Sequence, residues 1–331
     1  MTSQPARRVN SSDNPSEQQG SRTRYLEKES AVMKAASATE ATSDTEHVPP
    51  PPPPPQGPLS IVFTDIVKST AIWEAHAAAM ASAMQTHDDT VRSLITTNGG
   101  YEVKQNGDGF MIAFGSASSA VQFCLDVQEQ LLDKAWPSAI LKSTPGEETT
   151  DNEGHVLFRG LKLRMSAHWG EPVCVWNEVI QRMDYLGPMV NRAARFIEVT
   201  EGGQVVVSED FLFRLQAELE EERDDRGDDH NESNSSAGEN ARQHLPEELD
   251  LRLLRSGREQ KNLTHQPFRL RLLGAHEFKG LTELQKLYFI VPNSLEGRVE
   301  HWHQVTHVSG VKGNVRTAMT AATTATTTFK D

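Results

Sequence analysis

Cysteine is scarce in this chain of 331 residues, which has only Cys124 and Cys174. Two isolated cysteines exclude a disulfide framework and a cysteine-rich metal site, and both lie in apolar segments, so we expect buried thiols in a reducing compartment. Long apolar runs are also missing. None approaches the roughly 20 residues of a membrane span, and the first residues lack the apolar core of a signal peptide. These absences predict a cytoplasmic protein without a membrane span, peripheral to a membrane only through further domains or partners.

Positive charge is the third shortage, with 33 Lys and Arg against 46 Asp and Glu and a net charge of -13. The excess is local, because residues 217–250 hold 13 acids against 3 Arg, a net charge of -10. The rest of the chain is close to neutral and offers no basic surface. Nucleic acid is therefore not expected as a partner.

Low-complexity segments flank and interrupt one candidate domain. Residues 1–57 are polar and end in a proline run from Pro49 to Pro55, which predicts a disordered segment with an extended spacer, or a docking site for a proline-recognition module. Disorder is also expected for the acidic insert at about 217–262 and for the Thr- and Ala-rich tail at 294–331. The folded domain is expected at 58–293.

The periodicity of that domain predicts alternating strands and helices. Strands are expected at 59–65, 161–167, 204–207 and 284–291, with 172–176 pairing back, a hairpin at 101–114, and helices at 69–98, 118–132 and 188–199. The first helix is expected to break near His87. This order is a split βαβ pattern, and it predicts an α+β fold with a ferredoxin-like sheet and helices on one side.

Two acids stand at the ends of predicted strands. Asp65 follows the apolar run that starts at Ser60, and Asp108 lies in the turn of the hairpin. An ionised carboxylate at the end of a buried strand needs a cation. Asp65 as a helix cap and Asp108 as a turn residue are the simpler readings, since both residue types are common there. Together, however, the two acids match a site that holds divalent cations on a polyphosphate.

The motifs around these acids resemble the catalytic domain of class III nucleotidyl cyclases, and most closely that of fungal adenylate cyclases. The resemblance rests on FTDI from Phe63, EVKQNGDGF from Glu102, the segment at His168, and QRMDYLGPMVNRAARF from Gln181. It covers residues 58–215 and 268–292. It implies conversion of ATP to 3′,5′-cyclic AMP and pyrophosphate for second-messenger signalling. Two Mg²⁺ ions per site, with Mn²⁺ as a substitute, would be held by Asp65, Asp108 and the backbone carbonyl of Ile66.

The same resemblance assigns the other site residues. Lys104 donates to and Asp184 accepts from the base, a pattern that matches adenine and mismatches guanine. Asn191 would orient the ribose and Arg195 would stabilise charge on the α-phosphate; they are four residues apart and share a helix face. Lys279 would neutralise the β- and γ-phosphates. Arg192 is expected to be a surface residue.

Class III cyclases build each site from two catalytic domains, and this chain carries both halves, so the resemblance implies a head-to-tail homodimer with two complete sites. Three departures weaken the expectation of turnover but not of the fold. Gln105-Asn106 replaces the Thr-Glu of fungal relatives, Gly109 replaces a larger residue and is expected to loosen the turn, and Glu171 lies in a segment where some relatives place a phosphate-contacting Arg. Alternatives are a guanylate cyclase, a catalytically idle cyclase-like module that binds nucleotide or a partner, and a polymerase-like palm enzyme. Because fungal adenylate cyclases are much longer, we expect a fragment or a compact relative.

Overall fold

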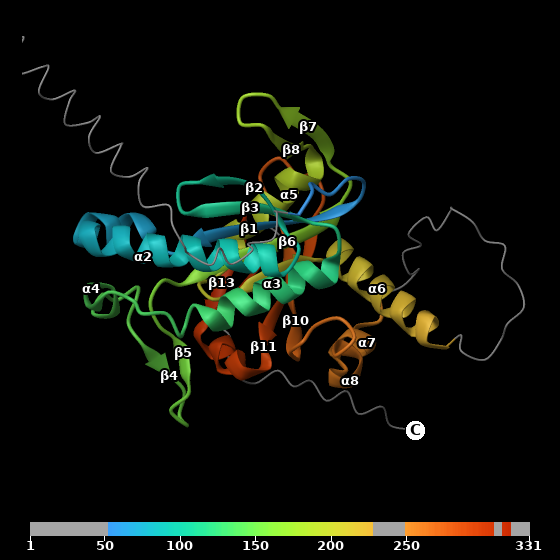
Figure 1. Cartoon of the computed structure of the whole chain (residues 1–331). Coiled ribbons are helices and arrows are strands. Elements are labelled where there is room, and N and C mark those ends of the chain that lie inside the picture. Colours follow the sequence, from blue (N-terminus) through green and yellow to red (C-terminus); the bar gives the residue numbers. More distant parts are fainter. Residues whose placement is uncertain (1–51, 228–248, 308–312, 319–331) are drawn as a thin grey trace, which may run out of the picture. The chain divides into compact units, whose positions relative to one another are not determined.

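The computed structural model describes residues 52–227, 249–307 and 313–318, which form a central sheet with helices (Figure 1). The start of the proline run, at Pro49, lies outside the described residues. No helix in the described ranges is long and apolar enough to cross a membrane.

Seven strands form the central sheet in the order β10-β11-β9-β6-β1-β3-β2. Their bounds are β1 Leu59–Ile66, β2 Tyr101–Asn106, β3 Gly109–Phe114, β6 Leu163–Gly170, β9 Val205–Ser208, β10 Phe268–His276 and β11 Gln285–Pro292. All neighbours are antiparallel except β6 and β9. The block β6-β1-β3-β2, connected through helices after β1 and after β3, has the ferredoxin-like order that the sequence predicts.

Alternation along the strands sends side chains to two different layers. On β1, Val62 and Ile66 enter the larger core cluster, while Leu59 and Ile61 enter a second cluster on the opposite face. Asp65 follows Leu59 and Ile61 in this alternation, so it projects from the opposite face. The β-branched run of β1 is buried on both sides, as expected from its continuous apolar character.

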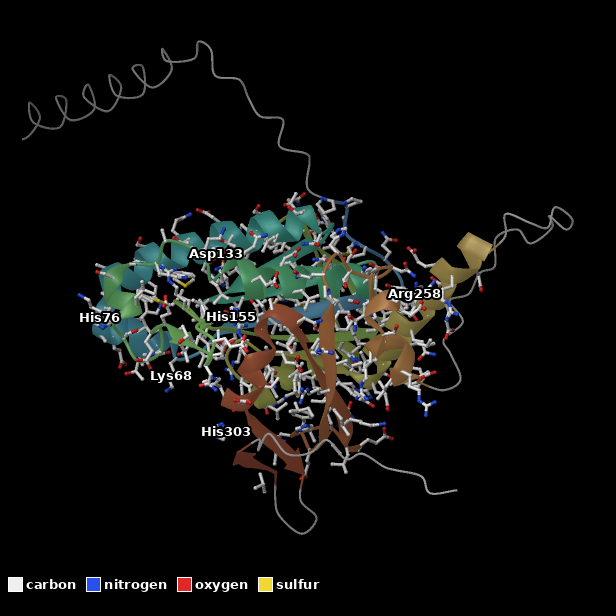
Figure 2. All side chains as sticks on the ribbon, turned by 90° about the horizontal axis from the view of Figure 1, so that it is seen from below. Lys68, His76, Asp133, His155, Arg258 and His303 are labelled. Atoms are coloured by element: carbon white, nitrogen blue, oxygen red, sulfur yellow. The ribbon has the colours of Figure 1, made fainter. Side chains whose placement is uncertain are left out.

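Three helices cover the face of the larger core: α2 Ser69–Thr97, α3 Ala117–Gln130 and α6 Glu209–Gly227 (Figure 1). Ser116 caps α3, because its hydroxyl accepts from the amide of Ser119. The break in α2 is at His76, where φ is -143°, and not near His87. His87 is instead fully buried within the regular part of the helix. Lys68 and His76 mark the start and the break of α2 (Figure 2).

The other face carries α5 Pro188–Phe196 and the hairpin of β7 Val173–Asn177 and β8 Arg182–Leu186 (Figure 1). Met189, Val190 and Ala193 of α5 pack on the sheet together with Tyr185 of β8. Two expectations are corrected here. Helices lie on both faces of the sheet, and β7 pairs with β8 as a separate two-stranded sheet instead of pairing back.

The acidic segment is more ordered than its composition suggests. Ala217–Gly227 continues helix α6, and Leu251–Arg255 and Gly257–Gln260 form α7 and α8, so the prediction of disorder is wrong for these residues; 228–248 lie outside the described part. Glu218 explains the helix: its carboxylate accepts from the amides of Ala117 and Ser118 at 2.7 and 2.8 Å and pairs with Arg214 at 2.9 Å. A carboxylate at the start of α3 compensates its orphan amides and its dipole.

Beyond residue 293 the chain also folds against the sheet. Asn293–His301 forms the 3₁₀ segment η2, and β12 His303–His307 pairs with β13 Asn314–Ala318. Arg298 is buried and donates to the carbonyls of Leu157 and Gly203. The domain boundary expected at 293 is therefore too early, and the tail is not disordered over these residues. The remaining described elements are α4 Ser138–Leu141, β4 Thr149–Thr150, β5 Val156–Phe158 and the 3₁₀ helix η1 Ile197–Val199.

Candidate active site

Asp65 lies near the end of β1, directly opposite Arg164 of β6. The guanidinium of Arg164 contacts Asp65 Oδ2 through Nε at 2.7 Å and through Nη2 at 2.6 Å. Both side chains are about one-third exposed, so the pair is accessible to small ions. Asp65 is thus a charged carboxylate whose partner is a guanidinium of the same chain.

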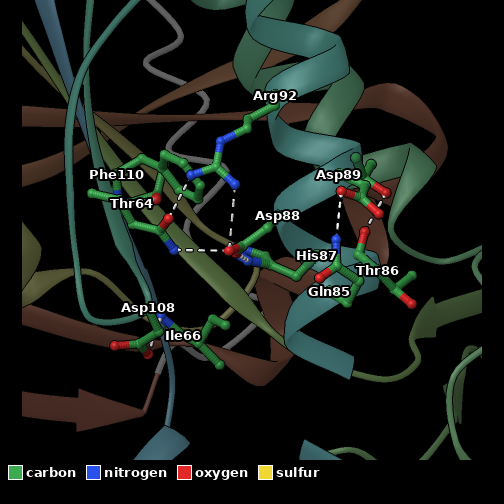
Figure 3. A network of polar contacts seen from close by, with 12 residues as sticks. Thr64, Ile66, Gln85, Thr86, His87, Asp88, Asp89, Arg92, Asp108 and Phe110 are labelled. Atoms are coloured by element: carbon green, nitrogen blue, oxygen red, sulfur yellow. Dashed lines mark hydrogen bonds and ion pairs between the residues drawn. The ribbon is translucent and has the colours of Figure 1, made fainter. Parts of the chain in front are cut away.

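Asp108 occupies the two-residue turn between β2 and β3, where Asn106 pairs with Gly109. Its Oδ2 accepts from the amide of Ile66 at 3.3 Å, and the hydroxyl of Thr64 accepts from the amide of Phe110 at 2.9 Å. These contacts fasten the turn to the end of β1, where Asp108 lies beside Ile66 (Figure 3). Since Asp65 precedes Ile66 on β1, the two predicted metal acids lie at the same edge of the sheet. The amide of Ile66 faces the Asp108 carboxylate.

Gly109 allows the close approach of this turn to β1. A Cβ atom at this position would lie 2.6 Å from the carbonyl oxygen of Thr64, a backbone atom. The residue therefore brings β3 close to β1 in this chain. The expectation that Gly109 loosens the turn is not supported by this tight contact.

Lys104 and Asp184 meet although they are 80 residues apart in the sequence. Lys104 Nζ, on β2, lies 2.8 and 2.9 Å from the two carboxylate oxygens of Asp184, on β8. The amide of Tyr185 also donates to Asp184 Oδ1 and fixes the carboxylate. The structure thus brings together the donor and the acceptor that the sequence pairs on a purine base.

Helix α5 carries Asn191 and Arg195 on its accessible side. Gly187, with φ of +110°, precedes Pro188 at the first turn, and the pair sets the start of the helix. Asn191 is exposed, and Arg195 is partly exposed and pairs with Glu198 at 2.9 Å. Buried neighbours hold the helix on the sheet, since Ser166 donates to the carbonyl of Ala193. Arg195 is therefore a partly exposed cation on a helix that is held against the sheet.

Arg192 is not the surface residue that the sequence suggested. It is half-buried, its Nε is enclosed, and its charge faces His168 and Asp210. Burial, and secondarily the charge of Arg192, lowers the pKa of His168 to about 3. His168 is thus a neutral core residue that accepts from or donates to Ser208 at 2.7 Å.

Lys279 is exposed in the segment between β10 and β11. Its neighbour Phe278 is buried and packs against Phe196 at the end of α5, with ring centroids 5.5 Å apart. The segment of Lys279 is therefore anchored beside the helix that carries Asn191 and Arg195. The structure shows no direct contact of Lys279 with the other predicted site residues among the described part of the chain.

Arg164 is the site residue that the sequence analysis missed. A signal was present, because an arginine at the second position of a buried strand is unusual and antiparallel pairing places it beside the end of β1. The pairing register is what turns it into the partner of Asp65, and register between strands 99 residues apart is not readable from local periodicity.

The donor set at this edge fits a hard divalent cation. Carboxylate and backbone oxygens are the ligands of Mg²⁺, which keeps several waters and is held by one or two carboxylates together with substrate phosphates. Consistently, no group of three or more His, Cys, Asp or Glu converges in the described ranges, as a cage built by protein alone would require. The Asp65–Arg164 ion pair is the competing interaction that a cation would have to replace.

Comparison with known proteins defines the class of this domain. Residues 52–238 match the family model "Adenylate and Guanylate cyclase catalytic domain", so the chain belongs to this family. It is 41% identical over 246 residues to an adenylate cyclase of Mycosarcoma maydis and 38% identical over 244 residues to one of Podospora anserina, each alignment covering 74% of this chain. The chain spans only about a tenth of the length of these relatives, 10% and 11%.

Solved structures agree with the fold. Two structures of adenylate cyclases from Trypanosoma brucei in their monomeric state match with TM-scores of 0.53 and 0.54 at 28% and 27% identity. They cover 77% and 75% of this chain and 96% and 92% of the solved chains. The α+β architecture with a central sheet is therefore that of a cyclase catalytic domain.

Proposed function

We propose that this domain is an adenylate cyclase that converts ATP to 3′,5′-cyclic AMP and pyrophosphate. The observation that carries the proposal is that each chain holds two pairs: Asp65 and Asp108 at one edge of the sheet, and Lys104 in contact with Asp184 between the adjoining hairpins. The first pair suits polyphosphate-bound cations and the second suits adenine. The similarity to fungal adenylate cyclases supports the same activity.

Selection of the base follows from the Lys104–Asp184 contact. Without nucleotide the ammonium and the carboxylate satisfy each other at 2.8 Å. On binding, Lys104 would donate to N1 of adenine and Asp184 would accept from the 6-amino group, so both charged groups stay paired. Guanine presents a donor and an acceptor in the reverse order, so it would leave Lys104 and Asp184 unpaired. Unpaired polar groups of this kind lower kcat/KM for the wrong nucleotide by orders of magnitude.

The residues of α5 and the β10–β11 segment would act on the phosphates and the ribose. Asn191 would hold the ribose so that its 3′ oxygen attacks the α-phosphorus, and the bond from that phosphorus to the β-phosphate oxygen would break. Arg195 would leave Glu198 and face the charge that develops on the α-phosphate, and Lys279 would neutralise the departing pyrophosphate. The hydroxyl proton passes to a phosphate oxygen of the substrate or to water.

Asp65, Ile66 and Asp108 would hold two divalent cations, Mg²⁺ with Mn²⁺ as a substitute. When bound, such cations lower the pKa of the attacking hydroxyl and neutralise the leaving group. Arg164 must give up Asp65 Oδ2 for this to happen, and the partial exposure of both side chains leaves room for that exchange.

We also propose a head-to-tail homodimer. The β7–β8 hairpin exposes apolar side chains on one of its faces: Val173 is 60% exposed, Val175 42% and Leu186 46%. A contiguous exposed apolar surface next to a substrate site is typical of a protein interface. In the dimer, the Asp65 and Asp108 of one subunit would face the Lys104, Asp184 and Arg195 of the other.

The test measures cyclic nucleotide formed by the purified full chain from ATP or GTP with Mg²⁺ or Mn²⁺, using mass spectrometry. ATP should be converted and GTP should not, and Asp108→Asn should abolish turnover while the exposed Asp133→Asn leaves it unchanged. Asp65→Ala and Arg195→Ala should each be inactive alone. An equal mixture should recover about a quarter of the wild-type activity, because about half of the dimers are heterodimers and one of the two sites in each heterodimer is intact. An inactive mixture in verified heterodimers would refute the shared site, and no cyclic product from wild type would refute the activity.

A further inference from the structure

A polar cluster behind the Asp108 turn links it to helix α2 (Figure 3). Gln105 lies on β2 next to Lys104 and two residues before Gly107. Because side chains alternate along a strand, Lys104 faces Asp184 on one side of the sheet and Gln105 faces α2 on the other. The strand end that presents Lys104 and Asp108 is therefore held from behind by Gln105.

Both polar atoms of the Gln105 amide have partners in this cluster. Its Nε2 donates to Asp88 Oδ2 at 3.0 Å and to the carbonyl oxygen of Gly107 at 3.1 Å, and its Oε1 accepts from Arg92 Nη2 at 2.6 Å. The two N–H groups of Nε2 thus meet two acceptor oxygens, and Oε1 meets one donor N–H group. The cluster thus specifies the orientation of the amide and connects α2 directly to the backbone of the turn.

Arg92 and Asp88 are themselves fixed. Arg92 makes a two-point contact with Glu102 on β2 through Nε at 3.1 Å and Nη2 at 3.2 Å, and its guanidinium lies over the ring of Phe110 at 5.0 Å. Asp88 contacts the ring nitrogen of the buried His87 at 2.9 Å. The partners of Gln105 are thus held by both strands of the hairpin and by the body of α2.

We propose that Gln105 is a positioning residue: it ties the Gly107–Asp108 turn to Asp88 and Arg92 of α2 and so holds the Asp108 carboxylate where a divalent cation binds. Asp108 is bonded to β1 through the amide of Ile66, and on the side of α2 the carbonyl of Gly107 accepts from Gln105. Gly107 has φ of +63°, and a Cβ atom added there would meet no atom within 4 Å. The inference rests on the proposed function only in taking Asp108 as a cation ligand.

The experiment uses the full chain and compares Gln105→Ala and Gln105→Glu with a matched control, Gln85→Ala. Gln85 lies on α2, the helix that carries Asp88 and Arg92, and makes a similar amide–carboxylate contact, to Asp89 at 2.8 Å, away from the turn. Gln105→Glu keeps the shape of the side chain but places an acceptor against Asp88 and the Gly107 carbonyl. Its effect should therefore exceed that of Gln105→Ala.

Two readouts separate positioning from simple loss of stability. The first is Mn²⁺ affinity, from the electron paramagnetic resonance signal of free Mn²⁺ in the presence of 3′-deoxyATP, which lacks the attacking hydroxyl. The second is amide hydrogen exchange of residues 106–110. Gln105→Ala should weaken Mn²⁺ binding about tenfold, as substitutions behind metal ligands do, and speed exchange in the turn, while Gln85→Ala changes neither. Saturating Mn²⁺ should restore most of the turnover of Gln105→Ala.

The outcomes distinguish this inference from the proposed activity. If the Gln105 variants alter Mn²⁺ affinity and turn exchange but wild type forms no cyclic AMP, the positioning role stands and the cyclase proposal fails. If wild type forms cyclic AMP and the Gln105 variants match it in both readouts, the positioning role is overturned. It is also overturned if wild type binds no Mn²⁺, or if exchange rises equally throughout the domain, which would indicate general destabilisation.

Discussion

Acidification should destabilise the domain through two buried histidines, His168 and His276. Burial lowers the pKa of His168 to about 3 and that of His276 to about 4, both from an ordinary value of 6.5. The unfolded chain therefore binds protons at a higher pH than the native one. The part of the stability that comes from keeping these two histidines neutral is fully present above pH 6.5, and it is lost as the pH falls from there toward the native pKa values.

The magnitude follows from the size of these shifts. Each histidine contributes a slope of about 1.4 kcal/mol per pH unit within its window. At pH 5 each histidine should therefore lower the free energy of unfolding by about 2 kcal/mol relative to pH 7.5, and the two together by about 4 kcal/mol. This is a large share of the 5–15 kcal/mol that stabilises a typical domain.

Urea unfolding followed by tryptophan fluorescence at pH 7.5 and pH 5 measures this loss. His168→Asn removes the titrating group and keeps a polar atom near Ser208, so the loss should fall to about half. The control is His155→Asn, since His155 is a solvent-exposed loop residue (Figure 2). If His168→Asn shows the same loss as wild type and as the control, the buried His168 does not take up a proton on unfolding and the reasoning is refuted.

Three further predictions follow from particular contacts. Arg164→Ala should tighten nucleotide-free Mn²⁺ binding about three- to fivefold, because a partly exposed ion pair is worth about 1 kcal/mol; weaker binding in the resonance assay would contradict competition for Asp65. Ending the chain at 293 instead of 302 removes the buried Leu295, Val299 and Trp302 and should lower the unfolding free energy by about 5 kcal/mol in urea titrations; equal stability would show that η2 is dispensable. Iodoacetamide should label the exposed Cys174 and spare the buried Cys124, whose pKa is raised by burial, so mass spectrometry should find one adduct on the native protein; two adducts would indicate opening of the core.

The sequence predicts elements whose signal is local. The continuous apolar run of β1, the Gly-Asp hairpin and the amphipathic α3 all appear in the structure within a few residues of the expected bounds. Cys174 shows the limit of such signals: it lies in an apolar segment, which suggested burial, but β7 belongs to a separate hairpin and the thiol is exposed. A short apolar strand has the same pattern in a core and at an interface.

Long-range contacts explain the remaining errors. Residues 217–227 look solvated by composition, yet Glu218 binds the amides of Ala117 and Ser118, a hundred residues away. Arg298 similarly holds the segment after 293 through the carbonyls of Leu157 on β5 and of Gly203, which are distant in sequence. In both cases a charged side chain stabilises the fold by satisfying backbone groups, and no local pattern reports which groups it will reach.

The site shows the same division between local and distant information. The resemblance to class III cyclases predicts Asp65, Asp108, Lys104 and Asp184 as site residues, but it cannot show that Lys104 and Gln105, adjacent in sequence, face opposite sides of one strand. Since β2 has one backbone, a displacement of α2 that moves Gln105 must also move Lys104 and the Asp108 turn. If Lys104 and Asp108 have the roles proposed above, base selection and cation binding are therefore coupled through β2. Gln105→Ala should accordingly reduce the preference for ATP over GTP as well as the affinity for Mn²⁺, whereas Gln85→Ala should change neither.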